Sequence, residues 1–285
     1  MAIPLRDDLY PRKIPFVTLA IIVINTAIWI FWEPTFRIPQ PVHVGPVGNQ
    51  VASDTHQNFL LINAAIPCEL VQRRPLVVKE VRSLLEKQRD TACIPKEKLG
   101  TGGEYKPVFP NKKIWLSPLL SMFFHGNLAH LFGNMLILLI LGNNVEDKLG
   151  HLRYLFLYLG GGAIAEVAHV ASNPYSITPA IGASGAIAAV IGSFLVFFPF
   201  ARVLTLITFP IPLAVYLPAF APILFWFVLQ FTPIVGSNVA VWAHIGGFAA
   251  GVLTGPLLYA TIRPPRTSPL PRGPVWVNTR PIVRF

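Results

Sequence analysis

The sequence predicts an all-α, polytopic membrane protein with six transmembrane helices. Its mean hydropathy is strongly positive, at +0.56. Only 13% of the 285 residues are charged, which is about half the share usual in a soluble domain. Long apolar runs recur along the chain, and a soluble core of this size cannot bury that much apolar surface. A lipid bilayer can, so we expect the runs to span a membrane.

Six segments meet or approach the roughly 20 residues that a helix needs to cross the hydrocarbon core. We expect the first to be retained, because no small-residue cleavage site follows it. The stretch between Arg202 and Arg263 has no formally charged residue and is long enough for two spans. The predicted spans are residues 14–32, 118–141, 154–171, 182–200, 211–231 and 239–262.

Lys and Arg residues in the short loops set the expected orientation. They precede the first span, lie between the second and third and between the fourth and fifth, and follow the sixth. We therefore expect a multi-pass protein of a bacterial inner membrane with both termini cytoplasmic. In this topology residues 1–13 are a cytoplasmic N-terminus, 14–32 the first span, 33–113 a long extracytoplasmic loop, 114–262 the other five helices, and 263–285 a disordered cytoplasmic tail rich in Pro and Arg.

The formal net charge of +10 does not indicate a nucleic-acid partner. The basic residues are spread over a loop, a tail and the short connections between apolar runs, and they form no single patch. We expect membrane lipid, and no nucleic acid, around this chain.

The long loop has the character of a soluble segment. Apolar residues recur with helical spacing within residues 78–85, which predicts a short amphipathic helix. The two cysteines of the chain, Cys68 and Cys93, lie on either side of it and lack metal-ligand spacing. In an oxidising compartment they could close a disulfide; the alternative is two unpaired thiols.

Ser184 stands among small residues in the motif Gly182-Ala183-Ser184-Gly185-Ala186. Small residues in a membrane helix often serve only close packing. However, Ser184 is at the outer start of the fourth predicted span, where the first backbone N–H groups lack partners within the helix. A helix start of this kind can stabilise an oxyanion, so Ser184 is a candidate nucleophile.

His244 lies in the outer part of the sixth predicted span. Gly247 and Gly251 follow it at offsets of three and seven, on the same helical face. Small residues also recur every four positions from Ser184. Two such faces can pack backbone against backbone, which would bring Ser184 and His244 within hydrogen-bond reach. The structural alternative is a histidine that only bonds a neighbouring carbonyl.

Further polar residues lie in the second and third predicted spans. His130 and Asn134 are four apart on one face, and His125 lies more than a turn above them. No carboxylate or cysteine completes a ligand set with them, so we predict no metal and no cofactor. Glu166 and His169 lie near the outer end of the third span, where they could reach interfacial water or supply a third catalytic group.

Taken together, these motifs resemble the rhomboid intramembrane serine proteases. The similarity is clearest over residues 112–262, and residues 3–8 also resemble bacterial members. The resemblance implies a six-helix rhomboid-like bundle and a Ser184–His244 dyad without a carboxylate. It also implies an oxyanion site formed by His130, Asn134 and the backbone N–H of Ser184.

The resemblance extends to residues around the dyad and to the substrate class. Family substrates are single-span membrane proteins with helix-destabilising residues near the cut. Residues 141–146 resemble the structural turn that follows the second span. Support of the active site is expected from His125, Gly182, Gly185, Gly247 and Gly251.

The sequence departs from the family pattern at two positions. Trp115 is followed by Leu116, where many members have arginine. Ala188 stands where some members stack a tyrosine on the catalytic histidine, which leaves open what orients His244.

The sequence therefore predicts an intramembrane serine endopeptidase. One alternative is a catalytically silent rhomboid-like scaffold that binds membrane helices, although silent relatives usually lose the Ser or the His. Another is a small transporter, against which stand the lack of charges deep in the spans and of a clear internal repeat.

Overall fold

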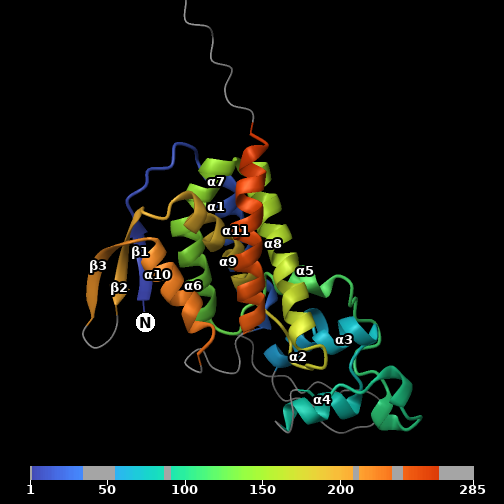
Figure 1. Ribbon diagram of the computed structural model, residues 1–285. Helices are drawn as coiled ribbons and strands as arrows, with labels where there is room; N and C mark the ends of the chain where they lie inside the picture. Colours follow the sequence, from blue (N-terminus) through green and yellow to red (C-terminus); the bar gives the residue numbers. More distant parts are fainter. Residues whose placement is uncertain (1, 35–54, 87–90, 208–211, 233–239, 263–285) are drawn as a thin grey trace, which may run out of the picture.

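Of the described helices, three are long and apolar enough to cross a membrane: Leu128–Leu149, His151–Ser172 and Val241–Ala260. The computed structural model describes residues 2–34, 55–86, 91–207, 212–232 and 240–262, so the predicted tail lies outside the described residues. Three shorter apolar helices accompany the long ones (Figure 1), and the count of six spans stays a prediction. The elements are β1 Ala2–Asp7, α1 Phe16–Ala27, η1 Ile28–Trp32, α2 Thr55–Asn63, α3 Pro67–Gln72, α4 Val78–Leu85, η3 Lys96–Lys98, η4 Gly103–Tyr105, α5 Ser117–Ser121, α6 Leu128–Ile137, η5 Leu138–Gly142, α7 Asn143–Leu149, α8 His151–Ser172, α9 Ser184–Phe197, β2 Arg202–Ile207, β3 Leu213–Pro218, α10 Phe220–Leu229 and α11 Val241–Ala260.

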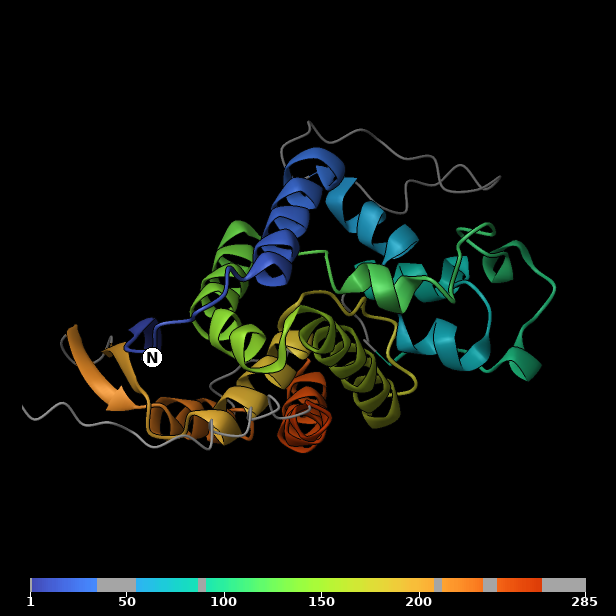
Figure 2. The same cartoon turned by 90° about the horizontal axis from the view of Figure 1, so that it is seen from above.

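Helices α8, α9 and α11 pack side by side at the centre of the protein (Figures 1 and 2). Every residue of α9 from Ala186 to Phe194 is buried. A short apolar helix of this kind has no face of its own for lipid, so its neighbours determine its position.

The backbones of α9 and α11 touch. A Cβ atom placed on Gly247 would collide with the carbonyl oxygen of Gly185, and one on Gly251 with the carbonyl oxygen of Ala189. Only glycine permits this approach, which is the arrangement expected where small residues face each other in a membrane.

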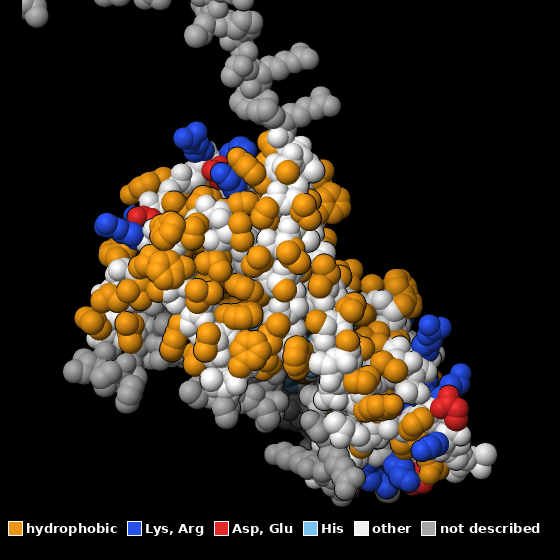
Figure 3. Space-filling model, in the orientation of Figure 1, with side chains coloured by type: hydrophobic (Ala, Val, Ile, Leu, Met, Phe, Trp, Pro, Cys, Tyr) orange, Lys and Arg blue, Asp and Glu red, His pale blue; other side chains and the backbone are white. Residues whose placement is uncertain are grey.

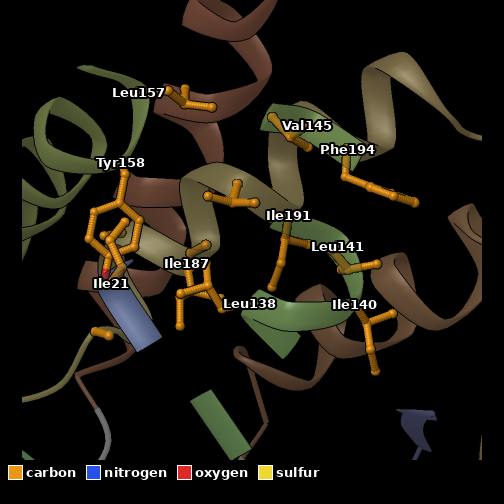
Figure 4. Close-up of a cluster of buried hydrophobic side chains, with 14 of the residues drawn as sticks. Ile21, Leu138, Ile140, Leu141, Val145, Leu157, Tyr158, Ile187, Ile191 and Phe194 are labelled. Carbon is orange, nitrogen blue, oxygen red and sulfur yellow. The ribbon is translucent and has the colours of Figure 1, made fainter. Parts of the chain in front are cut away.

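An apolar core lies where α9 meets α1, η5, α7 and α8 (Figure 4). It is filled by branched aliphatic and aromatic side chains that interdigitate from these helices. The residues labelled in the close-up are Ile21, Leu138, Ile140, Leu141, Val145, Leu157, Tyr158, Ile187, Ile191 and Phe194.

The outside of the bundle is apolar as well. On the face shown in Figure 3, hydrophobic side chains cover the helices, while Lys and Arg gather at the upper end and at the lower right. Phe156, Val167 and Leu253 are among the large apolar side chains that stay exposed. A broad exposed apolar surface of this kind fits contact with lipid.

A buried carboxylate joins α1 to α7. Glu146 is 1% exposed and accepts hydrogen bonds from the backbone N–H groups of Val17 and Thr18, both at 2.8 Å, and from the Thr18 hydroxyl at 2.7 Å. Its other contact is with Nδ1 of His151, at 2.6 Å. A carboxylate satisfies the free N–H groups at a helix start and complements the helix dipole there. Glu146 therefore caps α1 from the neighbouring helix.

The all-α prediction is wrong in one region, because a three-stranded antiparallel sheet lies beside α10 (Figures 1 and 2). Its strands follow the order β1-β2-β3. Strand β3 occupies the first part of the predicted fifth span, 211–231, and leaves only α10 as a helix. Prolines immediately before β3 and at its end are incompatible with the interior of one long helix. The sheet also takes up part of the predicted N-terminal segment 1–13.

Strand β1 is anchored by its acidic end. Oδ2 of Asp7 accepts a hydrogen bond from Nδ2 of Asn144 at 2.9 Å, and Oδ1 of Asp8 accepts one from the backbone N–H of Arg202, also at 2.9 Å. The opening residues thus tie the N-terminus to helix α7 and to strand β2.

The long loop forms a small folded unit at one end of the bundle. We call residues 55–86 and 91–113 the outer subdomain, because the predicted topology puts them outside. Helix α4 occupies the stretch in which the sequence pattern predicts an amphipathic helix, and α2 and α3 accompany it. A disulfide joins Cys68 to Cys93. Burial lowers the pKa of Lys112, and its ammonium pairs with the buried Glu69 carboxylate at 2.5 Å.

Close contact between α9 and α11 predicts the effect of a single methyl group. We expect Gly251→Ala to lower the melting temperature in detergent by several degrees, because overpacking typically costs about 1–3 kcal/mol. The matched control is Gly160→Ala in α8, where a Cβ would meet nothing within 4 Å. Thermal unfolding of both variants checks this. Equal melting temperatures for the two would contradict the close contact.

Candidate active site

Ser184 and His244 lie side by side at the outer end of the bundle. Ser184 is the first residue of α9, and His244 lies in the first turn of α11. The Nε2 atom of His244 is 2.9 Å from Oγ of Ser184. His244 is only 9% exposed. The geometry is that of a serine hydroxyl next to a possible general base.

Gln230, which directly follows α10, orients the imidazole. Its Oε1 lies 2.9 Å from Nδ1 of His244, and its Nε2 donates to the backbone carbonyl of Trp226 at 3.2 Å. Because the amide nitrogen is engaged there, Oε1 faces the histidine, and an amide oxygen can only accept. Nδ1 of His244 therefore carries a proton, and the lone pair of Nε2 is left to accept the proton of Ser184.

Sequence reasoning missed Gln230 and left open what orients His244. In the structure two residues position the imidazole of His244. One is Gln230, through its hydrogen bond to Nδ1, and the other is Trp226, whose ring centroid lies 5.8 Å from that of the imidazole. A signal was present, because Gln230 is the one amide side chain in the predicted span 211–231. Polar groups inside a span carry a functional hypothesis by default.

Of the three hydrogen-bond donors predicted for an oxyanion, the backbone N–H of Ser184 and the His130 ring adjoin the start of α9, and Asn134 lies one helical turn after His130 in α6. The backbone N–H of Ser184 begins α9, where N–H groups lack helical partners. Gly182 has φ +115°, and a Cβ there would come 2.8 Å from Cε1 of His130, so the His130 ring lies against the turn before the nucleophile. Asn134 is 8% exposed, and its Nδ2 has no hydrogen-bond partner among the described residues. A buried donor in that condition can serve a bound group.

The prediction that residues 118–141 form one span is wrong at its start. Helix α6 begins only at Leu128, because the side chain of Asn127 caps it by accepting a hydrogen bond from the backbone N–H of His130 at 2.8 Å. His125 therefore lies in the connection before the helix. Its ring is fully buried 5.1 Å from that of His130, and its backbone N–H donates to the Glu33 carboxylate at 3.1 Å.

The other support residues fall into the contacts between helices. Gly185 lies where a Cβ would come 2.8 Å from Cβ of Ala165, so it lets α8 approach α9. Gly247 and Gly251 let α11 approach α9, as described above. Neither Glu166 nor His169 is the partner of Nδ1 of His244, because Gln230 occupies that position.

One cluster of potential metal ligands occurs among the described residues, formed by Cys68, Glu80 and Cys93. The two sulfur atoms are bonded to each other, so neither is a thiolate. Glu80 is engaged by the Arg74 guanidinium at 2.7 Å. The cluster is therefore a structural staple of the outer subdomain.

The outer subdomain holds the connection that leads into Ser184. A β-bridge pairs Ala65 with Ala180, whose backbone N–H donates to the Ala65 carbonyl at 2.8 Å. The backbone N–H of Cys68 donates to the carbonyl of Ser176 at 2.9 Å. Ile177 is fully buried in the apolar core of the outer subdomain. The segment before the nucleophile is thus fixed to the part of the chain that contains the disulfide.

Ser121, the last residue of α5, contacts both the turn before Ser184 and the outer subdomain. Its backbone carbonyl accepts the N–H of Gly182 at 2.9 Å, and its hydroxyl oxygen accepts the N–H of Ala65 at 2.6 Å. One residue therefore connects the turn before Ser184 with the outer subdomain.

The family model "Rhomboid domain" matches residues 112–261 of this chain, more than half of its length. The chain belongs to the rhomboid family. It is 35% identical over 149 residues to RHOMBOID-like protein 4 of Arabidopsis thaliana, covering 49% of this chain and 32% of that protein.

Two further relatives come from other organisms. The mitochondrial presenilin-associated rhomboid-like protein of Homo sapiens is 36% identical over 89 residues, 30% of this chain and 23% of that protein. Rhomboid protease GluP of Bacillus subtilis (strain 168) is 37% identical over 81 residues, 28% of this chain and 15% of that protein. The matches thus span less than a third of the length of each of these three relatives.

The hydrogen bond between Gln230 and His244 predicts that a substitution at position 230 changes the rate at which Ser184 reacts. We expect Gln230→Leu to slow the reaction of Ser184 with a fluorophosphonate by about tenfold or more, because one orienting hydrogen bond to the imidazole is lost. Val228→Ala, on the exposed side of α10, should react like the wild type. Rates of gel-based labelling measure both, and an unchanged rate in Gln230→Leu would exclude the orienting role.

The link from the disulfide to the turn before Ser184 predicts sensitivity to reductant. We expect dithiothreitol to lower both the melting temperature and the labelling rate of the wild type, since a native disulfide typically contributes about 2–5 kcal/mol. The double variant Cys68→Ser/Cys93→Ser should start at the lower values and not respond to reductant. A reduced wild type that labels at its full rate would show that the turn holds without the bond.

Proposed function

We propose that this chain is an intramembrane serine endopeptidase that cleaves single-span membrane proteins with a Ser184–His244 dyad. The observation that carries the proposal is the 2.9 Å contact between Nε2 of His244 and Oγ of Ser184, in a histidine whose Nδ1 is held by Gln230. The name of the Bacillus subtilis relative, a rhomboid protease, supports a peptidase.

In the first half of the reaction, Nε2 of His244 takes the proton of the Ser184 hydroxyl as Oγ attacks the substrate carbonyl carbon. The carbonyl oxygen gains negative charge. The backbone N–H of Ser184, the His130 ring and Nδ2 of Asn134 are the donors that would stabilise it. Gln230 keeps the imidazole in the tautomer that accepts a proton at Nε2, and it then stabilises the imidazolium through Nδ1.

The second half returns the proton. His244 donates it from Nε2 to the leaving amine, and the peptide bond breaks to leave an acyl group on Ser184. A water molecule then loses a proton to His244 and attacks the acyl carbon, which releases the new carboxyl end and restores the serine. No carboxylate is needed, because the neutral amide of Gln230 fixes the position of the histidine.

The main alternative is a silent scaffold that binds membrane helices without cutting them. A scaffold does not need an activated serine, whereas here a buried histidine and the amide that orients it converge on one hydroxyl. Buried polar groups are costly within a membrane, so this arrangement favours catalysis.

We also propose that both termini face the cytoplasm of a bacterial cell and that the outer subdomain lies outside it. The distribution of Lys and Arg in the short loops supports this orientation, and an oxidising compartment suits the disulfide. Alkaline phosphatase, which works only outside the cytoplasm, should be active when fused after Gly102 and inactive when fused after Phe285. Activity of the C-terminal fusion would reverse the proposed orientation.

An activated serine predicts labelling by a fluorophosphonate without any knowledge of the substrate. Purified wild-type protein in detergent should label, and Ser184→Ala and His244→Ala should both fail to do so. His169→Ala, on the neighbouring helix α8, is a matched control that should label. A folded wild type that does not react would favour the scaffold, and labelling that persists in Ser184→Ala would remove the nucleophile assignment.

A further inference from the structure

A buried carboxylate, Glu33, lies at the end of the first predicted span. It directly follows η1 and is only 3% exposed. A carboxylate that is removed from water is unfavourable unless it is paired and hydrogen-bonded. Neither the dyad nor the oxyanion donors described above use this side chain, so its burial needs another explanation.

Two segments distant in the sequence hold the Glu33 carboxylate. Its Oε1 and Oε2 atoms lie 3.1 and 3.3 Å from the backbone nitrogen of His125, which donates to them. Its Oε2 atom also lies 3.1 Å from Nε2 of His56, the second residue of α2. A carboxylate can only accept, so Nε2 of His56 carries the proton. Glu33 thus joins the first span to the outer subdomain and to the connection before α6.

Three aromatic rings join the same segments. Trp32, Phe59 and Phe124 come from η1, from α2 and from the connection before α6, and their ring centroids lie 5.0 to 5.8 Å apart. Ring contacts at these distances and edge-to-face angles are favourable by themselves. The three segments therefore have an apolar contact that does not depend on Glu33. The carboxylate adds the polar contact that fixes the backbone at His125.

From His125 the contacts lead to the proposed oxyanion donor His130. The ring of His125 is fully buried, 5.1 Å from that of His130. Asn127, two residues after His125, caps the helix that carries His130. The His130 ring in turn lies against Gly182, in the turn before Ser184. A shift of the backbone at His125 would therefore move both the start of α6 and the His130 ring.

We propose that Glu33 is a positioning residue for the oxyanion donor His130. Its carboxylate holds the backbone N–H of His125, and His56 of the outer subdomain holds the carboxylate in place. Displacement of a catalytic group by about 1 Å can slow a reaction by about 100-fold, so a contact this far from the serine can still matter. The inference rests on the proposed function.

A pair of substitutions of similar size tests the contact. Glu33→Leu leaves the His125 N–H without its acceptor, and we expect it to slow labelling of Ser184 by a fluorophosphonate about 10- to 100-fold. The phosphonyl oxygen of this reagent takes the place of the oxyanion, so the labelling rate depends on its donors. Glu33→Gln keeps an acceptor oxygen and should label at close to the wild-type rate. Glu97→Ala, which removes an exposed carboxylate of the outer subdomain, is the control and should label normally.

A double-mutant cycle separates positioning of His130 from a general effect on the fold. His130→Ala removes the donor itself, and loss of one such donor typically costs about 10²–10³ in rate. If Glu33 acts through His130, adding Glu33→Leu to His130→Ala should slow labelling little further. If Glu33→Leu does not fold, Glu33→Asp replaces it in the cycle, because aspartate keeps the charge and withdraws the carboxylate by one methylene. We expect Glu33→Asp to be slow in the wild-type background and to add little in His130→Ala.

Two results would overturn the inference and leave the proposed function in place. One is a folded Glu33→Leu or Glu33→Asp variant that labels at the full rate. The other is a full additional loss of rate in the His130→Ala background, which would show that Glu33 acts on the fold and not through His130. A folded wild type that does not label at all would overturn both, because His130 would then lie beside an unreactive serine.

Discussion

The direct contact between the backbones of α9 and α11 is the constraint on which the rest of the site depends. The outside of the bundle is apolar, so burial of apolar surface favours contact between these helices no more than contact between each helix and lipid. Gly247 and Gly251 remove the side chains that would hold the helices apart. This close approach brings His244 of one helix to within 2.9 Å of Ser184 of the other. Ser184 and His244 are 60 positions apart in the sequence. They can form a hydrogen-bonded pair because glycine at positions 247 and 251 leaves room for the two helices to touch.

Two other parts of the chain supply what the contact between two helices cannot. Orientation of the imidazole comes from Gln230 at the end of α10, whose amide is itself fixed by a backbone carbonyl. Position of the turn before the nucleophile comes from the outer subdomain, through the pairing of Ala65 with Ala180 and through Ser121. The site is thus assembled from distant segments, each held by short polar contacts in an apolar surrounding.

Much of this arrangement could be predicted from the sequence, because long apolar runs, glycine spacing and isolated polar residues are local signals. The membrane spans, the faces of Ser184 and His244 and the helix at 78–85 follow from them, and the family follows from the resemblance of three ordered motifs to known members. The sheet could not be predicted from such local signals. The uncharged stretch after Arg202 is as apolar as a membrane span, so its strands resemble part of a helix in hydropathy. In addition, strand β1, which pairs with β2, lies about 200 residues earlier in the sequence. Gln230 was visible as a polar residue, but its contact with His244 depends on how α10 packs. Helix α6 begins about ten residues later than the predicted start of the second span because the side chain of Asn127 caps it, and hydrophobic periodicity does not register such a cap.

The most direct test of the account is cleavage within a bilayer. A test portion of the purified protein is labelled with a fluorophosphonate to show that Ser184 is fully reactive. The unlabelled remainder is placed in liposomes with a panel of tagged single-span proteins that have helix-destabilising residues near the outer end of the span. The account predicts two fragments from at least one member of the panel with the wild type, and none with Ser184→Ala. Intact substrates throughout, despite a fully reactive serine, would contradict it and favour a protein that binds membrane helices without cutting them.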